Sequence, residues 1–86
     1  MSNADTATIE AAALASGSRV NWLADLRTAT AMPAERFDAA VRALARQANV
    51  EVLPEDNRKA IPAHARNGVT IGGQMSHHLR VLYPTM

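Results

Sequence analysis

The sequence predicts an α+β fold of one domain, in which three helices are followed by a β-hairpin. Capped stretches with helical apolar spacing fill the first half of the chain, and two short alternating stretches follow them. The length of 86 residues suffices for one domain but not for two. We predict the domain over residues 6–83, with residues 1–5 as a disordered N-terminus or tag remnant and residues 84–86 as a C-terminal tail.

The first helix is predicted over residues 6–16. Asp5 or Thr6 provides an N-cap, and Gly17 lies where a left-handed residue commonly ends a helix. The apolar face combines Ile9 with alanines, which favour helix but bury little surface. We therefore expect this helix to pack closely against a neighbouring element or a second subunit.

An extended segment and a second helix are predicted next. Residues 18–20 are expected to be extended, and Asn21 to cap a helix over residues 22–28. Leu23 and Leu26 are spaced so that both point inward from that helix.

A third, longer helix is predicted to open at Pro33, which a first turn tolerates, and to stop near Asn49. Glu35 in the first turn suits the positive end of the helix dipole. One apolar stripe carries Phe37, Val41, Leu44 and Ala48. The opposite face carries Glu35, Ala39, Arg42 and Arg46.

The alternating stretches Val50–Leu53 and 78–82 are predicted to pair as an antiparallel hairpin. The segment between them is too long for a plain hairpin loop, so it should carry structure of its own. Residues 62–67, which open with a proline, fit one or two helical turns, and Gly72 with Gly73 fits a turn.

The order of these elements resembles that of the winged helix-turn-helix superfamily of DNA-binding domains, over about residues 6–83. In this chain and in that superfamily, the elements follow in the same order: helix, short strand, helix, turn, helix, strand, long loop and strand. The residues that carry the resemblance are Leu23, Leu26, Phe37, Val41, Leu44, Val50 and Val52. The resemblance implies a winged helix with a three-helix core and a β-hairpin wing that contains a long structured wing loop.

The resemblance also implies a small protein that binds double-stranded DNA, as a transcriptional regulator or a DNA-associated accessory protein. In winged-helix DNA binders the third helix enters the major groove and the wing touches the backbone or the minor groove. The alternative is a module for protein–protein interaction without direct DNA binding, favoured by the net charge of +1 and by Glu35 and Asp38. Because symmetric DNA sites usually need a protein dimer, we expect a homodimer, formed through the first helix or residues 81–86.

The candidate DNA contacts are basic or hydroxyl side chains on the helices, the turn and the wing. They are Arg19, Arg27, Thr28, Thr30, Arg36, Arg42, Arg46, Arg58 and Lys59, with Arg66 in or near the wing. Arginine presents a planar fork that suits phosphate or guanine, although a GC-rich genome would also enrich arginine. For Arg42 and Arg46 the alternative is a solvated helix face, and for Arg58 and Lys59 it is an ordinary solvated turn. The third helix opens with Pro, Ala and Glu, which are poor donors to base edges. We therefore expect this protein to contact the DNA phosphate backbone more than the base edges.

No residue pattern indicates catalysis, a metal site or a cofactor, so we predict a protein that is not an enzyme. His64, His77 and His78 are the three histidines, and the two neighbours would point to opposite faces of a strand. Cysteine is absent, no HExxH spacing occurs, and Gly72-Gly73 lacks the frame of a phosphate-binding loop. No segment reaches the roughly 20 apolar residues of a membrane span. The absence of cysteine fits a cytoplasmic protein, associated with the nucleoid if it binds DNA.

Overall fold

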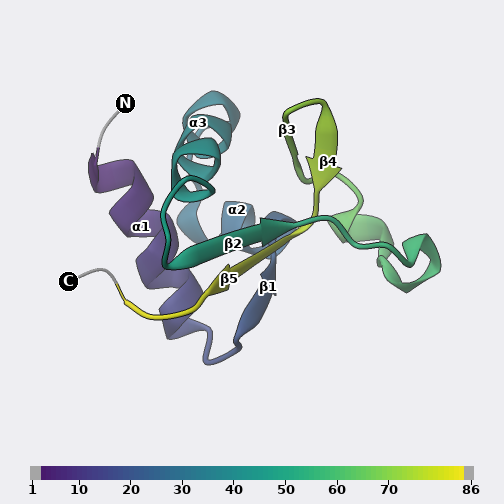
Figure 1. The fold of residues 1–86 in the computed structure, drawn as a ribbon, viewed down its shortest axis with the longest axis horizontal. Helices are drawn as coiled ribbons and strands as arrows, with labels where there is room; N and C mark the ends of the chain where they lie inside the picture. Colours follow the sequence, from purple (N-terminus) through teal and green to yellow (C-terminus); the bar gives the residue numbers. More distant parts are fainter. Residues whose placement is uncertain (1–2, 85–86) are drawn as a thin grey trace.

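The computed structural model describes residues 3–84 and contains three helices and five short strands (Figure 1). The helices are α1 (Asn3–Ala15), α2 (Leu23–Thr30) and α3 (Ala34–Leu44). The strands are β1 (Val20–Trp22), β2 (Val50–Leu53), β3 (Val69–Ile71), β4 (Gln74–Ser76) and β5 (His78–Val81). Their order along the chain confirms the predicted α+β fold class, in a winged-helix-like arrangement.

A three-stranded antiparallel sheet has the strand order β1-β5-β2, so the last strand lies in the middle. The predicted pairing of β2 with β5 is confirmed, with Val52 opposite Leu79. β1 pairs with the other edge of β5 and places Asn21 opposite the same leucine. Leu79 is fully buried because it lies at the centre of this sheet and faces the helices.

The helices enclose one hydrophobic core against the sheet. Its largest fully buried side chains are Phe37, Ile9, Leu23, Leu26, Leu44, Leu79, Val41 and Val69. The inward positions predicted for the second and third helices are therefore confirmed, with one exception at Ala48 that is described below. With so few large rings, the core is built from aliphatic side chains around the single phenylalanine.

The first helix begins at Asn3, three residues before the predicted start. Asp5 belongs to its first turn and is buried, so residues 3–5 are helical and not a disordered N-terminus. Residues 1–2 of that predicted segment, and 85–86 of the predicted tail, lie outside the described part of the chain. Asp5 pairs with Arg36, 31 positions away, a partner that local sequence does not reveal.

The predicted cap of the second helix is wrong. Asn21 lies in β1, and its side-chain amide donates to the carbonyl of Ser18 at 3.3 Å. The helix starts one residue later than predicted, with Trp22 at the capping position and the Leu23 N–H donating to the His77 carbonyl at 2.8 Å. Strand pairing thus supplies the partner that a capping side chain would otherwise provide.

The third helix ends at Leu44, well before the predicted stop at Asn49. The chain then turns, and the Gln47 N–H donates to the Leu44 carbonyl at 2.9 Å. Ala48 therefore leaves the inner stripe and is exposed, while Ala40 is the further small residue buried on that face. Arg46 also lies beyond the helix, so it no longer extends the helical face that carries Arg42.

Residues 54–77 form an insert between β2 and β5, and it carries structure of its own as predicted. It contains two 3₁₀ turns, η1 (Arg58–Ala60) and η2 (Ala63–Ala65), followed by the β3–β4 hairpin. Gly72 and Gly73 form the hairpin turn with φ of 58° and 81°, the positive values that a two-residue type I′ turn requires at both positions. In Figure 1 this hairpin stands beside α3, and the 3₁₀ turns lie at the far end from α1.

In the part of the chain that the structure describes, none of the helices has both the length and the apolar content that crossing a membrane requires.

Candidate nucleic-acid interface

The insert is fastened to the helices by hydrogen bonds from two arginines. From α2, the Arg27 guanidinium donates to the carbonyls of Asn67 at 3.2 Å and Gly68 at 3.1 Å. From α3, Arg42 Nε donates to the carbonyl of Thr70 in β3 at 3.0 Å. Val69 between these contacts is buried in the main core. The insert is therefore a packed part of the domain, and its β3–β4 hairpin lies against α3.

Arg27 is occupied by contacts inside the protein. It donates to Asp38 Oδ1 at 3.0 Å, and its guanidinium carbon lies 5.0 Å from the centre of the Phe37 ring, in cation–π range. Its Nε is buried and has no hydrogen-bond partner among the described residues. Because its guanidinium is bonded to Asp38 and to two carbonyls of the insert, Arg27 links α2, α3 and the insert, and a DNA contact would have to compete with these bonds.

Arg36 forms a bidentate ion pair with Asp5 of α1. Its Nη2 lies 2.6 Å from Oδ1 and its Nε 3.2 Å from Oδ2. The hydrogen bonds from Arg36 lower the pKa of the Asp5 carboxyl below its usual value, and the same pair raises the pKa of Arg36. This pair joins the first turn of α1 to α3.

The two candidate threonines bond to their own helix. Thr28 Oγ1 donates to the Ala24 carbonyl at 3.2 Å, and Thr30 Oγ1 donates to the Leu26 carbonyl at 2.9 Å. Each hydroxyl hydrogen is therefore already used in the unbound protein. A phosphate contact from either residue would require breaking that bond.

The remaining candidate cations are exposed and form no ion pair among residues 3–84. They are Arg19, Arg42, Arg46, Arg58, Lys59 and Arg66. The acidic side chains, by contrast, are mostly paired with arginine or histidine, namely Asp5, Asp25, Asp38, Glu51 and Glu55. Among the exposed acidic residues of that range, Glu35 and Asp56 have no ion pair. The uncompensated charge on the described surface is therefore mainly positive, although the whole chain carries only +1.

The three histidines form hydrogen bonds to or within the insert. His78 Nε2 lies 3.0 Å from Glu55 Oε2, and its ring stacks on Trp22 with centroids 4.2 Å apart. The bond with His78, with help from the Asn57 N–H, lowers the pKa of the Glu55 carboxyl. His64 Nε2 lies 3.0 Å from Oδ1 of Asp25 in α2. Within residues 3–84, no group of three or more His, Asp or Glu side chains is placed to hold a metal ion.

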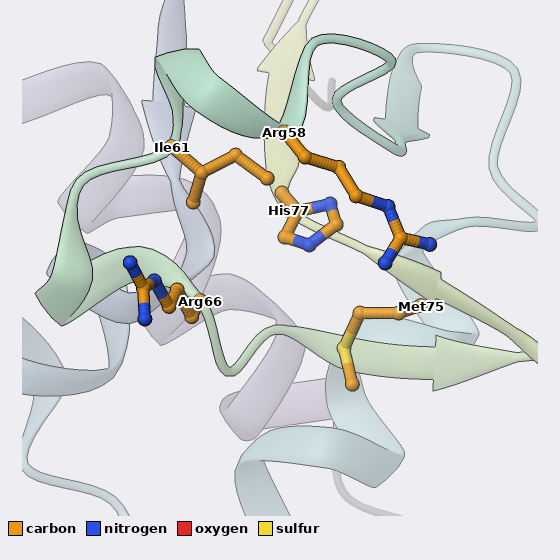
Figure 2. A pocket seen from close by; sticks show the side chains of 5 residues that line it. All are labelled: Arg58, Ile61, Arg66, Met75 and His77. Atoms are coloured by element: carbon orange, nitrogen blue, oxygen red, sulfur yellow. The ribbon is translucent and has the colours of Figure 1, made fainter.

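A cavity of about 480 Å³ opens in the insert (Figure 2). It is lined by Arg58, Ile61, Arg66, Met75 and His77. Of the five lining residues, sequence reasoning placed the two arginines in or near the wing, considered His77 only as a possible metal ligand, and did not single out Ile61 or Met75. The lining residues come from separate turns and a strand, and only the folded insert brings them together.

The described residues thus form a winged-helix-like α+β domain whose exposed cations without ion pairs lie on α3, on the turn after it and on the insert, with Arg19 in the loop before β1. Comparison of the chain with protein-family models, with curated proteins and with solved structures found no match.

Proposed function

We propose that this protein binds double-stranded DNA through the phosphate backbone, as a small regulator or DNA-associated accessory protein. The observation that carries the proposal is the set of exposed cations without ion pairs, which α3, the following turn and the insert present. Arg42 and Arg46 would hold one stretch of backbone, and Arg58 with Lys59 another. Such a protein would work in the cytoplasm, in association with the nucleoid.

Backbone contact suits this surface better than base reading. The exposed first turn of α3 offers Ala34 and Glu35, neither of which donates a hydrogen bond to a base edge. The β3–β4 hairpin packs beside the same helix, and Arg27 and Arg36 are engaged elsewhere. We therefore expect weak, sequence-independent affinity, with Kd of about 1–100 µM at physiological salt.

Fluorescence anisotropy with a random duplex across a salt series tests this function. The wild type is expected to lose affinity steeply as salt rises, because each phosphate contact releases counterions. Two double variants, Arg42→Ala/Arg46→Ala and Arg58→Ala/Lys59→Ala, should each flatten the log–log slope by about two. Arg80→Ala is the control, since Arg80 is paired with Glu51 and should leave the slope unchanged. Absence of binding at low salt would refute DNA binding, and unchanged slopes in both double variants would refute this surface.

A second candidate function, self-association through α1, has its own supporting observation. The exposed positions of α1 carry no charge at all: Ala4, Ala7, Thr8, Ala11, Leu14 and Ala15. A solvent-facing helix normally carries charged residues on its outer face. Leu82 and Tyr83 of the C-terminal segment are also about half exposed. A second copy is the partner that we infer for this face, because two identical helix faces whose exposed side chains are small and uncharged can approach across a two-fold axis without like-charge repulsion.

Sedimentation equilibrium tests the self-association. The wild type is expected to dimerise at concentrations up to about 100 µM, and Ala11→Glu to be monomeric because it buries a charge in the interface. Ala29→Glu, at an exposed position of α2, is the matched control and should remain dimeric. A monomeric wild type across this range, or a dimeric Ala11→Glu, would exclude α1 as the interface.

A further inference from the structure

The cavity in the insert combines hydrogen-bond donors from three separate segments. Arg58 comes from η1, Arg66 follows η2, and His77 lies between β4 and β5. Figure 2 shows the two arginine side chains on opposite sides of His77, with the Arg58 guanidinium nearer the imidazole and the Arg66 guanidinium directed away from it. Neither guanidinium has a hydrogen-bond partner among residues 3–84.

The ring of His77 is held in one orientation by the backbone. Its Nδ1 accepts a hydrogen bond from the Glu55 N–H at 3.1 Å. A neutral imidazole that accepts at Nδ1 carries its hydrogen on Nε2. The Nε2–H has no acceptor among the described residues, so His77 adds a third donor between the two arginines.

The apolar part of the lining is also fixed in place. Ile61 is buried, with 8% of its surface exposed, and Met75 is partly exposed at 39%. The sulfur of Met75 accepts the Gly68 N–H at 3.2 Å, which sets the direction of this otherwise flexible side chain. The cavity therefore offers an apolar surface next to its donors.

Acidic groups contribute little to the cavity. None lines it, although a neighbouring hollow that shares Arg58, Met75 and His77 also includes Glu55 and Asp56. Glu55 is already bonded to His78 and to the Asn57 N–H. Asp56 is the one nearby carboxylate without an ion pair in the described chain, and it lies on the Arg58 side.

We propose that this cavity binds a small organic dianion, with one anionic group near Arg58, the other near Arg66 and a flat apolar body over Ile61, Met75 and His77. The volume of about 480 Å³ falls in the range of small-molecule sites and exceeds what a single inorganic ion fills. Two separated cations favour two separated anionic groups, because guanidinium–carboxylate bonds are directional. This site goes beyond DNA binding and does not depend on it.

Titration calorimetry with two simple probes tests the site. Terephthalate carries a carboxylate at each end of a benzene ring, and benzoate carries only one. Terephthalate is expected to bind about tenfold more tightly than benzoate, since it gains a second charge-assisted contact. Arg58→Gln and Arg66→Gln should each lower the affinity for terephthalate about tenfold, to the level of benzoate, and Asp56→Asn should raise it about twofold.

The matched control is Arg46→Gln, which removes the same charge from an exposed arginine outside the cavity and should leave terephthalate binding unchanged. Equal affinity for the two probes, equal loss in the Arg46 variant, or no heat of binding up to about 10 mM terephthalate would each overturn the proposal. Because no nucleic acid is present in this titration, its outcome is separate from that of the DNA experiment: either can fail while the other succeeds.

Discussion

Replacing Phe37 with alanine is expected to lower the free energy of unfolding by about 3–5 kcal/mol. The ring is fully buried in the core, and a loss of this size is typical for a buried phenylalanine. The same change removes the aromatic surface beneath the Arg27 guanidinium. A domain of this length has a total stability of roughly 4–13 kcal/mol, so the loss is a large fraction of it. Urea denaturation followed by circular dichroism measures the change.

Two further variants make the Phe37 result interpretable. Phe37→Leu keeps most of the buried volume and should cost about 1–2 kcal/mol. Leu82→Ala removes an apolar side chain that is 48% exposed and should cost less than about 0.5 kcal/mol. If Phe37→Ala were as mild as Leu82→Ala, Phe37 would not be the centre of the core described above.

Replacing Gly68 with alanine is expected to detach the β3–β4 hairpin from the domain. A Cβ at this position would lie 1.7 Å from the carbonyl oxygen of Ser76, and the obstructing atom belongs to backbone, which cannot rotate aside. Gly68 also accepts from Arg27 and donates to Met75, so its displacement disturbs both bonds. We expect a loss of about 3 kcal/mol or more, the upper end of the cost of overpacking. Amide hydrogen exchange of Val69 and Ser76 should become much faster.

Gly72→Ala is the matched control for Gly68→Ala. Gly72 has a positive φ of 58°, but an added Cβ would meet nothing within 4 Å. Its replacement should therefore cost only the strain of a left-handed alanine, about 1–2 kcal/mol, and should leave the hairpin in place. A similar loss for both glycines would show that the close approach at Gly68 relaxes at little cost.

The elements that sequence reasoning placed correctly are those encoded locally. The apolar spacing of Phe37, Val41 and Leu44 fixes the inner face of α3, whatever the rest of the chain does. The alternation in Val50–Leu53 and the glycine pair of the hairpin turn are local signals of the same kind. The ends of helices were less predictable, since pairing partners from elsewhere in the fold decide them.

The candidate DNA-binding residues also divide into what local sequence predicts and what only the fold decides. Local sequence identifies Arg27 and Arg36 as basic residues but not the carboxylates they meet, which lie 11 and 31 positions away along the chain. Only the fold separates these paired arginines from Arg42 and Arg46, which have no ion pair among the described residues. The cavity was missed for the same reason, because Ile61 and Met75 are ordinary residues until the insert closes around them.

The central place of β5 has a consequence for how the protein comes to be folded. The last of the described strands along the chain is the one that joins the other two strands of the sheet, since β1 and β2 both pair with β5 and not with each other. Until residues 78–81 have left the ribosome, the three-stranded sheet lacks its central strand. The hydrophobic core between the sheet and the helices then also lacks Leu79. We expect nascent chains that stop short of β5 to remain protease-sensitive, and the domain to fold late, in one step, after its C-terminal strand emerges.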